Sequence, residues 1–181
     1  MAFGDFSFPQ VKVDLGLTFE DAVLLIEPPA IPLREDFASM IAEGATLALA
    51  INTEKARSEF MIAPILLELR RRLGGHFSLF SGVELNVEPS KGLNGVCDFI
   101  LAASPLQSFL AAPLVTVVEA KNDNVRNGLG QCIASMYAAE LFNQKAGSPA
   151  GVVYGVVTTG SAWKFLRMKD KAVTLDLKGF R

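Results

Sequence analysis

Apolar and polar positions repeat with two different periods along this chain, and these periods divide it into predicted helices and strands. Apolar residues recur at helical spacing in residues 35–50, 53–73 and 129–142. Short apolar runs bounded by turn-forming residues are typical of strands, and they occupy residues 77–80, 83–87, 96–101, 114–120, 152–158, 162–168 and 172–177. The mixture predicts an α/β fold, with a mixed β-sheet flanked by helices.

Local signals near the N-terminus and at one proline refine this pattern. Thr18 is followed three residues later by Asp21, which predicts a short capped helix through Ile26. Pro64 is expected to kink the helix at residues 53–73. Three further prolines break the chain after the first predicted helix: Pro28, Pro29 and Pro32.

Length and charge set the domain organisation. The chain has 181 residues, half of them hydrophobic and 20% charged, which suits one compact domain overall. The first fifty residues carry eight acidic and two basic side chains, a net charge of −6, and the remainder carries +4. We therefore expect an acidic, partly helical extension over residues 1–52 and a core over 53–181. Basic clusters at 70–72 and 164–181 are open to two interpretations, phosphate contacts or ordinary solvated positions.

Several features favour a cytoplasmic protein with no membrane partner. The longest apolar stretches fall well short of the roughly 18 residues that a membrane span needs, and the first nine residues lack the basic and apolar regions of a secretory signal. Cys97 and Cys132 both lie in apolar segments. They are expected to be reduced core thiols rather than a disulfide.

Candidate chemistry is concentrated on two apolar strands. Side chains on a strand alternate between faces, so Glu119 and Lys121, at the end of the run 114–120, share a face about 6 to 7 Å apart. Asp98 lies inside the run 96–101, where a carboxylate is costly to bury without a charged partner. Two carboxylates and a lysine therefore predict a site for Mg²⁺ or Mn²⁺, which prefer oxygen ligands.

Other enzyme classes find little support in the chain. His76 is the only histidine, which leaves no basis for a serine triad or a two-histidine metalloprotease helix. The serine-hydrolase motif G-x-S-x-G and the P-loop motif are both absent from the sequence. The pair Gly128 and Gly130 is a weak phosphate signal, and an unusual φ at the start of a helix is the preferred explanation for it.

The order of these elements resembles the PD-(D/E)XK nuclease superfamily over about residues 53–160. The resemblance is carried by a helix, a strand with Asp98, a strand that ends in Glu119 and Lys121, and a helix that opens near Gln131. Segments 128–143 and 152–165 are also similar to bacterial members. The family has the restriction-endonuclease-like fold. One departure is Cys97, which precedes Asp98 where the motif's name places a proline.

The resemblance implies a set of roles. Asp98 and Glu119 would bind the divalent metal, and Lys121 would orient the attacking hydroxide, or take its proton if burial lowers the lysine's pKa. Gln131 would position a water or a phosphate. A further metal-binding glutamate is expected on the preceding helix, where Glu54 is slightly favoured over two alternatives, Glu59 and Glu68.

The expected activity is metal-dependent hydrolysis of phosphodiester bonds in nucleic acid, with DNA as the first choice of substrate. The main alternative is an inactive domain of the same fold that binds nucleic acid or protein. A homodimer or a place in a larger complex is compatible with both interpretations.

Overall fold

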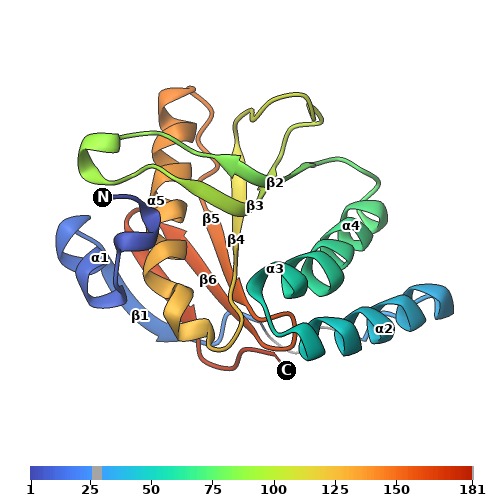
Figure 1. Ribbon diagram of the computed structural model, residues 1–181. Coiled ribbons are helices and arrows are strands. Elements are labelled where there is room, and N and C mark those ends of the chain that lie inside the picture. The colour runs from blue at the N-terminus through green and yellow to red at the C-terminus, as the bar shows by residue number, and fades with distance from the viewer. Residues whose placement is uncertain (26–29, 181) are drawn as a thin grey trace.

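The computed structural model describes residues 1–25 and 30–180, and in them a seven-stranded mixed β-sheet spans the molecule (Figure 1). The strand order is β1-β7-β6-β5-β4-β3-β2. Pairs β1/β7 and β4/β5 are parallel and the other neighbours are antiparallel. The strands are β1 (Thr18–Ala22), β2 (Ser78–Glu84), β3 (Val96–Ala102), β4 (Leu114–Ala120), β5 (Val153–Thr158), β6 (Trp163–Lys169) and β7 (Ala172–Asp176). The predicted α/β class and mixed sheet are confirmed.

Helices pack on both faces of this sheet. Helix α5 (Leu129–Lys145) covers one face together with α1 (Phe8–Asp14) and the 3₁₀ turn η1 (Phe3–Asp5). The other face is covered in part by α3 (Glu54–Arg57), a π-helical turn η2 (Ser58–Ile62) and α4 (Ala63–Arg72), with α2 (Glu35–Ile51) packed on η2 and α3. Two further 3₁₀ turns are η3 (Pro89–Lys91) and η4 (Val125–Gly128).

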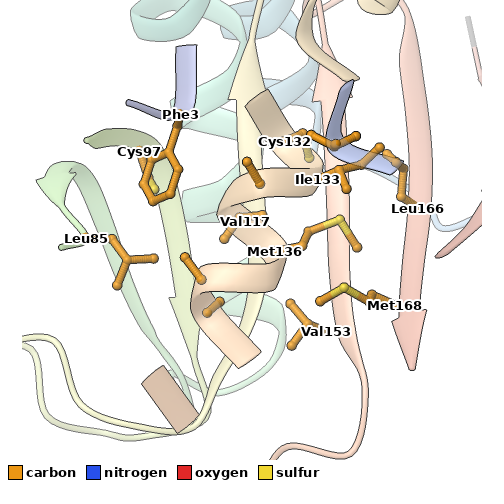
Figure 2. Close-up of a cluster of buried hydrophobic side chains, with 14 of the residues drawn as sticks. Phe3, Leu85, Cys97, Val117, Cys132, Ile133, Met136, Val153, Leu166 and Met168 are labelled. Carbon is orange, nitrogen blue, oxygen red and sulfur yellow. The ribbon is translucent and has the colours of Figure 1, made fainter. Parts of the chain in front are cut away.

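Alternation along β4 separates two hydrophobic clusters. Val117 belongs to the cluster under α5, and Val118 belongs to the cluster that includes Ile62 and Leu66 of η2 and α4. Figure 2 shows the α5 side, where Ile133 and Met136 of the helix meet strand residues. This alternation fixes which face each residue at the end of β4 occupies.

Both cysteines lie in the cluster under α5. Cys97 and Cys132 are buried and are not joined in a disulfide. The prediction of core thiols is confirmed.

The predicted helix at residues 18–26 is wrong over its described part. Residues Thr18–Ala22 form β1, which pairs in parallel with β7. Ile26, Pro28 and Pro29 lie outside the described residues. The local cap pattern is overridden because hydrogen bonds to a strand about 150 residues later satisfy the backbone of this segment.

The first 22 residues pack into the same core as the rest of the chain. Phe3 and Val11 belong to the cluster under α5, and Phe19 packs against it. The expected extension therefore contributes an edge strand and core side chains. Within the described residues, we find no helix with the length and apolar character needed to cross a membrane.

Two predicted boundaries shift. The runs at 77–80 and 83–87 join into the single strand β2, in which Gly82 has a φ of 63°. The helix expected at 53–73 extends from Glu54 to Arg72, but the π-helical turn η2 interrupts it directly before Ala63 and Pro64. A proline has no N–H group and disturbs helical hydrogen bonding, which accounts for an irregularity at this place.

Candidate active site

Asp98 marks the point where β3 and β4 stop pairing. The last paired residues at this end are Phe99 and Val118. One residue further, the Oδ2 atom of Asp98 accepts a hydrogen bond of 2.8 Å from the backbone N–H of Ala120. The carboxylate thus replaces a strand partner at the mouth of an open cleft. Burial raises the pKa of Asp98, against the opposing effects of the Ala120 amide and of Lys121.

Glu119 is the most deeply buried acid of this group. Its side chain comes from the end of β4 and the residue is 3% exposed. Burial, and then the nearby charge of Asp98, raise the pKa of Glu119 to about 8, although Lys121 acts in the opposite direction. Two carboxylates so placed favour a further positive charge between them.

The side chain of Lys121 is a positively charged ammonium group close to Glu119 and Glu54. Its backbone N–H donates to the carbonyl of Thr158 at 2.8 Å, which holds it against β5. Its Nζ atom lies 2.6 Å from Oε1 of Glu119 and 3.6 Å from Oε2 of Glu54. Burial lowers the pKa of Lys121, but the surrounding carboxylates outweigh it and the net shift is upward. The lysine is therefore an ammonium donor at neutral pH, and the condition for its use as a base is not met in this arrangement.

The cleft beside Asp98 has a volume of about 400 Å³ and lies between η2, α3 and β2. One wall comes from the helical side and the other from β2. Its lining residues are Glu54, Lys55, Ser58, Glu59, Ser81, Gly82, Asp98 and Ala120.

Of the three candidate glutamates, Glu54 lies nearest to the site. Thr53 caps α3 by accepting a hydrogen bond from Ala56 N, at 3.1 Å, and this places Glu54 in the first turn. From there Glu54 approaches Lys121, as given above. Glu59 also lines the cleft, but its carboxylate pairs with Lys55 at 3.0 Å.

Glu68 belongs to a different cluster. Its carboxylate accepts hydrogen bonds of 2.7 Å from Arg71 and from Arg72, and it does not line the cleft. These two guanidinium groups lower the pKa of Glu68 to about 2.

Gln131 is half-buried in the first turn of α5. Its Oε1 atom lies 3.9 Å from the position that a Cβ on Gly4 would take, so the amide extends toward η1. Across residues 1–25 and 30–180, no hydrogen bond or ion pair joins Gln131 to Asp98, Glu119 or Lys121. The structure thus brings together Asp98, Glu119, Lys121 and Glu54, without a direct contact to Gln131.

Four residues that line the cleft are not predicted from the sequence, namely Lys55, Ser58, Ser81 and Gly82. Nothing in their local pattern distinguishes them from ordinary helix and strand residues. They line the cleft because α3, η2 and β2 meet there, which is a property of the tertiary fold.

Whether a metal ion could bind in this site depends on the oxygen atoms that the nearby carboxylates supply. Among the described residues, no group of three or more histidine, cysteine, aspartate or glutamate side chains is arranged to hold a metal ion. Asp98 and Glu119 are neighbouring carboxylates on adjacent strands, both with raised pKa values. Their oxygen atoms suit Mg²⁺ or Mn²⁺. A hydrated Mg²⁺ needs few protein ligands, so the chemistry of these two carboxylates is compatible with such an ion.

A larger groove, of about 520 Å³, lies elsewhere on the sheet between α4 and strands β3 to β6. Its lining is almost entirely apolar and contains no acid or base: Ile65, Leu66, Leu69, Leu101, Thr116, Val118, Tyr154, Val156, Trp163 and Phe165. Chemistry that needs charged groups is therefore assigned to the smaller cleft at Asp98.

A comparison of the chain with models of known protein families finds no match, and a comparison with curated protein sequences finds none either.

Proposed function

We propose that this protein is a metal-dependent nuclease that hydrolyses phosphodiester bonds in nucleic acid, with DNA as the first choice of substrate. One observation carries the proposal. The half-buried carboxylate of Asp98 lines an open cleft, the buried carboxylate of Glu119 lies on the adjacent strand, and Nζ of Lys121 lies 2.6 Å from Oε1 of Glu119.

The order of elements around the cleft supports a restriction-endonuclease-like arrangement. Helix α4 precedes the antiparallel strands β2, β3 and β4, and α5 connects β4 to the parallel strand β5. Asp98 and Glu119 lie where β3 and β4 separate. This is the order of helices and strands that carries the resemblance to the PD-(D/E)XK superfamily.

Each side chain has a chemical task in this proposal. Asp98 and Glu119 would hold Mg²⁺ or Mn²⁺, with Glu54 as a further oxygen donor. When bound, the metal lowers the pKa of the attacking water and neutralises charge on the phosphate. Lys121, as an ammonium group, would donate a hydrogen bond to that water or to a phosphate oxygen, and so favour the more negative transition state. Gln131, whose amide extends toward η1, would position a water or a phosphate.

Cleavage assays on single-stranded, duplex and branched DNA and RNA with Mg²⁺ or Mn²⁺ test the proposal. The comparison uses wild type, Glu119→Gln and the exposed control Glu43→Gln. Activity in wild type and control, and its loss in Glu119→Gln, would support the nuclease and identify its substrate class. Calorimetry should show Mn²⁺ binding to wild type and control, with weaker binding to Glu119→Gln.

The alternative is an inactive domain that binds nucleic acid or protein. It is favoured by the ion pairs of Lys121, because the ammonium group already offsets part of the negative charge of Glu119 and Glu54. Such a domain would show neither cleavage of any substrate nor Mn²⁺ binding.

A further inference from the structure

Gly128 is a glycine whose role is spatial rather than conformational. It is buried at the join of η4 and α5, with φ −91° and ψ −6°. Other residues adopt these angles, so the expectation of an unusual φ at this helix start is wrong. The space around Gly128 gives another reason for a residue without a side chain.

Three side chains fill the place where a Cβ atom of residue 128 would lie. A Cβ there would come within 2.6 Å of Cγ1 of Val157, 3.2 Å of Cγ of Glu119 and 3.2 Å of Cε of Lys121. The first distance is too short for two carbon atoms, and the other two are tight. The stems of Glu119 and Lys121 therefore pack directly on the backbone of Gly128.

The backbone around Gly128 is also packed on its opposite side. Two residues later, a Cβ on Gly130 would lie 2.1 Å from the carbonyl oxygen of Phe6. The first turn of α5 is thus enclosed between the N-terminal segment on one side and β4 and β5 on the other. A side chain at residue 128 would displace its neighbours rather than the helix.

We propose that Gly128 is a positioning residue that sets the locations of the Glu119 carboxylate and the Lys121 ammonium group. Its consequence for catalysis rests on the proposed nuclease function. A displaced Lys121 would lose its short contact with Glu119 and its proximity to Glu54. Displacing a catalytic group by about 1 Å lowers turnover more than it weakens substrate binding.

The experiment compares wild type, Gly128→Ala, Val157→Ala and the double variant Gly128→Ala/Val157→Ala. Val157→Ala removes the atom that a Cβ at residue 128 would approach most closely, so the double variant keeps only the tight contacts with Glu119 and Lys121. Two readouts are used. One is kcat and KM for cleavage, and the other is the rate at which an amine-acylating reagent labels Lys121, measured by mass spectrometry.

We expect Gly128→Ala and the double variant to lower kcat by about 10- to 100-fold with KM changed by less than about threefold. Val157→Ala alone should keep the wild-type kcat within about threefold and the wild-type labelling rate. Gly128→Ala should also have a lower thermal unfolding midpoint than wild type. The double variant should have the same midpoint as Val157→Ala, but it should keep the low kcat and the altered labelling rate of Lys121.

Two outcomes would overturn the inference. One is wild-type kcat and labelling in the double variant, which would assign the role of Gly128 to packing against Val157. The other is a double variant that does not fold, which would make Gly128 a requirement of the fold itself. If wild type cleaves no substrate, the nuclease proposal fails separately, and the labelling rate of Lys121 alone decides the inference.

Discussion

The carboxylate of Asp98 accepts a hydrogen bond from the backbone amide of Ala120 at the point where β3 and β4 separate. One oxygen atom is used in this way to satisfy a backbone group that has no strand partner. The side chain therefore has a structural role as well as its proposed role as a metal ligand, and substitutions can separate the two.

Asp98→Asn and Asp98→Ala should differ in stability but not in activity. The amide oxygen of asparagine can accept the bond from Ala120 N, whereas alanine leaves that N–H unpaired. We expect Asp98→Ala to lower the free energy of unfolding by about 1–3 kcal/mol. In EDTA, the free energy of unfolding of Asp98→Asn should equal or exceed that of wild type. Urea denaturation measures this, and cleavage assays should show both variants to be inactive. Equal stabilities for the two variants would contradict the structural role, and the exposed Asp21→Asn serves as control.

Glu119 should make the protein less stable as the pH rises from about 4.5 to about 8. Its pKa is about 8 in the folded protein, against an ordinary value of 4.5. The folded state therefore binds more protons than the unfolded state in this interval, and the free energy of unfolding falls with increasing pH. Asp98 has a raised pKa as well and contributes in the same direction.

Glu119→Gln removes most of this dependence. In EDTA the variant should be more stable than wild type above pH 8, by an amount on the order of 2 kcal/mol, and close to it at pH 5. Urea denaturation from pH 5 to 9 measures the difference. Adding Mn²⁺ should stabilise wild type much more than the variant. A pH-independent difference would argue against a costly carboxylate at residue 119.

Much of the arrangement at β4 and α5 is predictable from the sequence because its signals are local and strong. The branched apolar run at 114–118 and the small apolar residues of 129–142 identify a buried strand and a buried helix. The same alternation places Glu119 and Lys121 on one face. The structure agrees in each case, and the distance of 2.6 Å between their charged atoms follows from that shared face.

The rest depends on contacts that a local pattern does not encode. The helix-cap pattern at Thr18 is overridden by pairing with β7. The sequence likewise offers three glutamates on one helical stretch, Glu54, Glu59 and Glu68, and does not decide between them. Only the packing of this stretch in the fold determines which carboxylate lies near Lys121. Gln131 lies at the sequence position expected for a site residue, but its side chain extends toward η1 and makes no direct contact with Asp98, Glu119 or Lys121.

Glu54 and Glu59 should differ in their effect on the site. Glu54 lies 3.6 Å from Lys121, whereas Glu59 pairs with Lys55 at the cleft wall. We expect Glu54→Gln to lower kcat by about 10-fold or more, and Glu59→Gln to change it by less than about threefold. Mn²⁺ affinity, measured by calorimetry, should follow the same order. The reverse order would assign the additional ligand role to Glu59.

Glu68 should matter for stability but not for catalysis, and its effect should disappear in acid. The guanidinium groups of Arg71 and Arg72 hold the Glu68 pKa at about 2, below its ordinary 4.5, so the carboxylate stabilises the fold above pH 4.5 and this contribution is lost as the pH falls toward 2. Arg72 also donates to the carbonyl of Pro32 at 2.8 Å, which ties the segment before α2 to α4.

Glu68→Gln should therefore unfold at a lower temperature than wild type at pH 7, while the two proteins converge near pH 2. Thermal unfolding followed by circular dichroism between pH 2 and pH 7 gives the comparison, with Glu43→Gln as the exposed control. Cleavage by Glu68→Gln at a temperature where it is folded should match wild type, because Glu68 does not line the cleft. A loss of cleavage in folded Glu68→Gln would instead place Glu68 in the catalytic machinery, contrary to its pairing with two arginines.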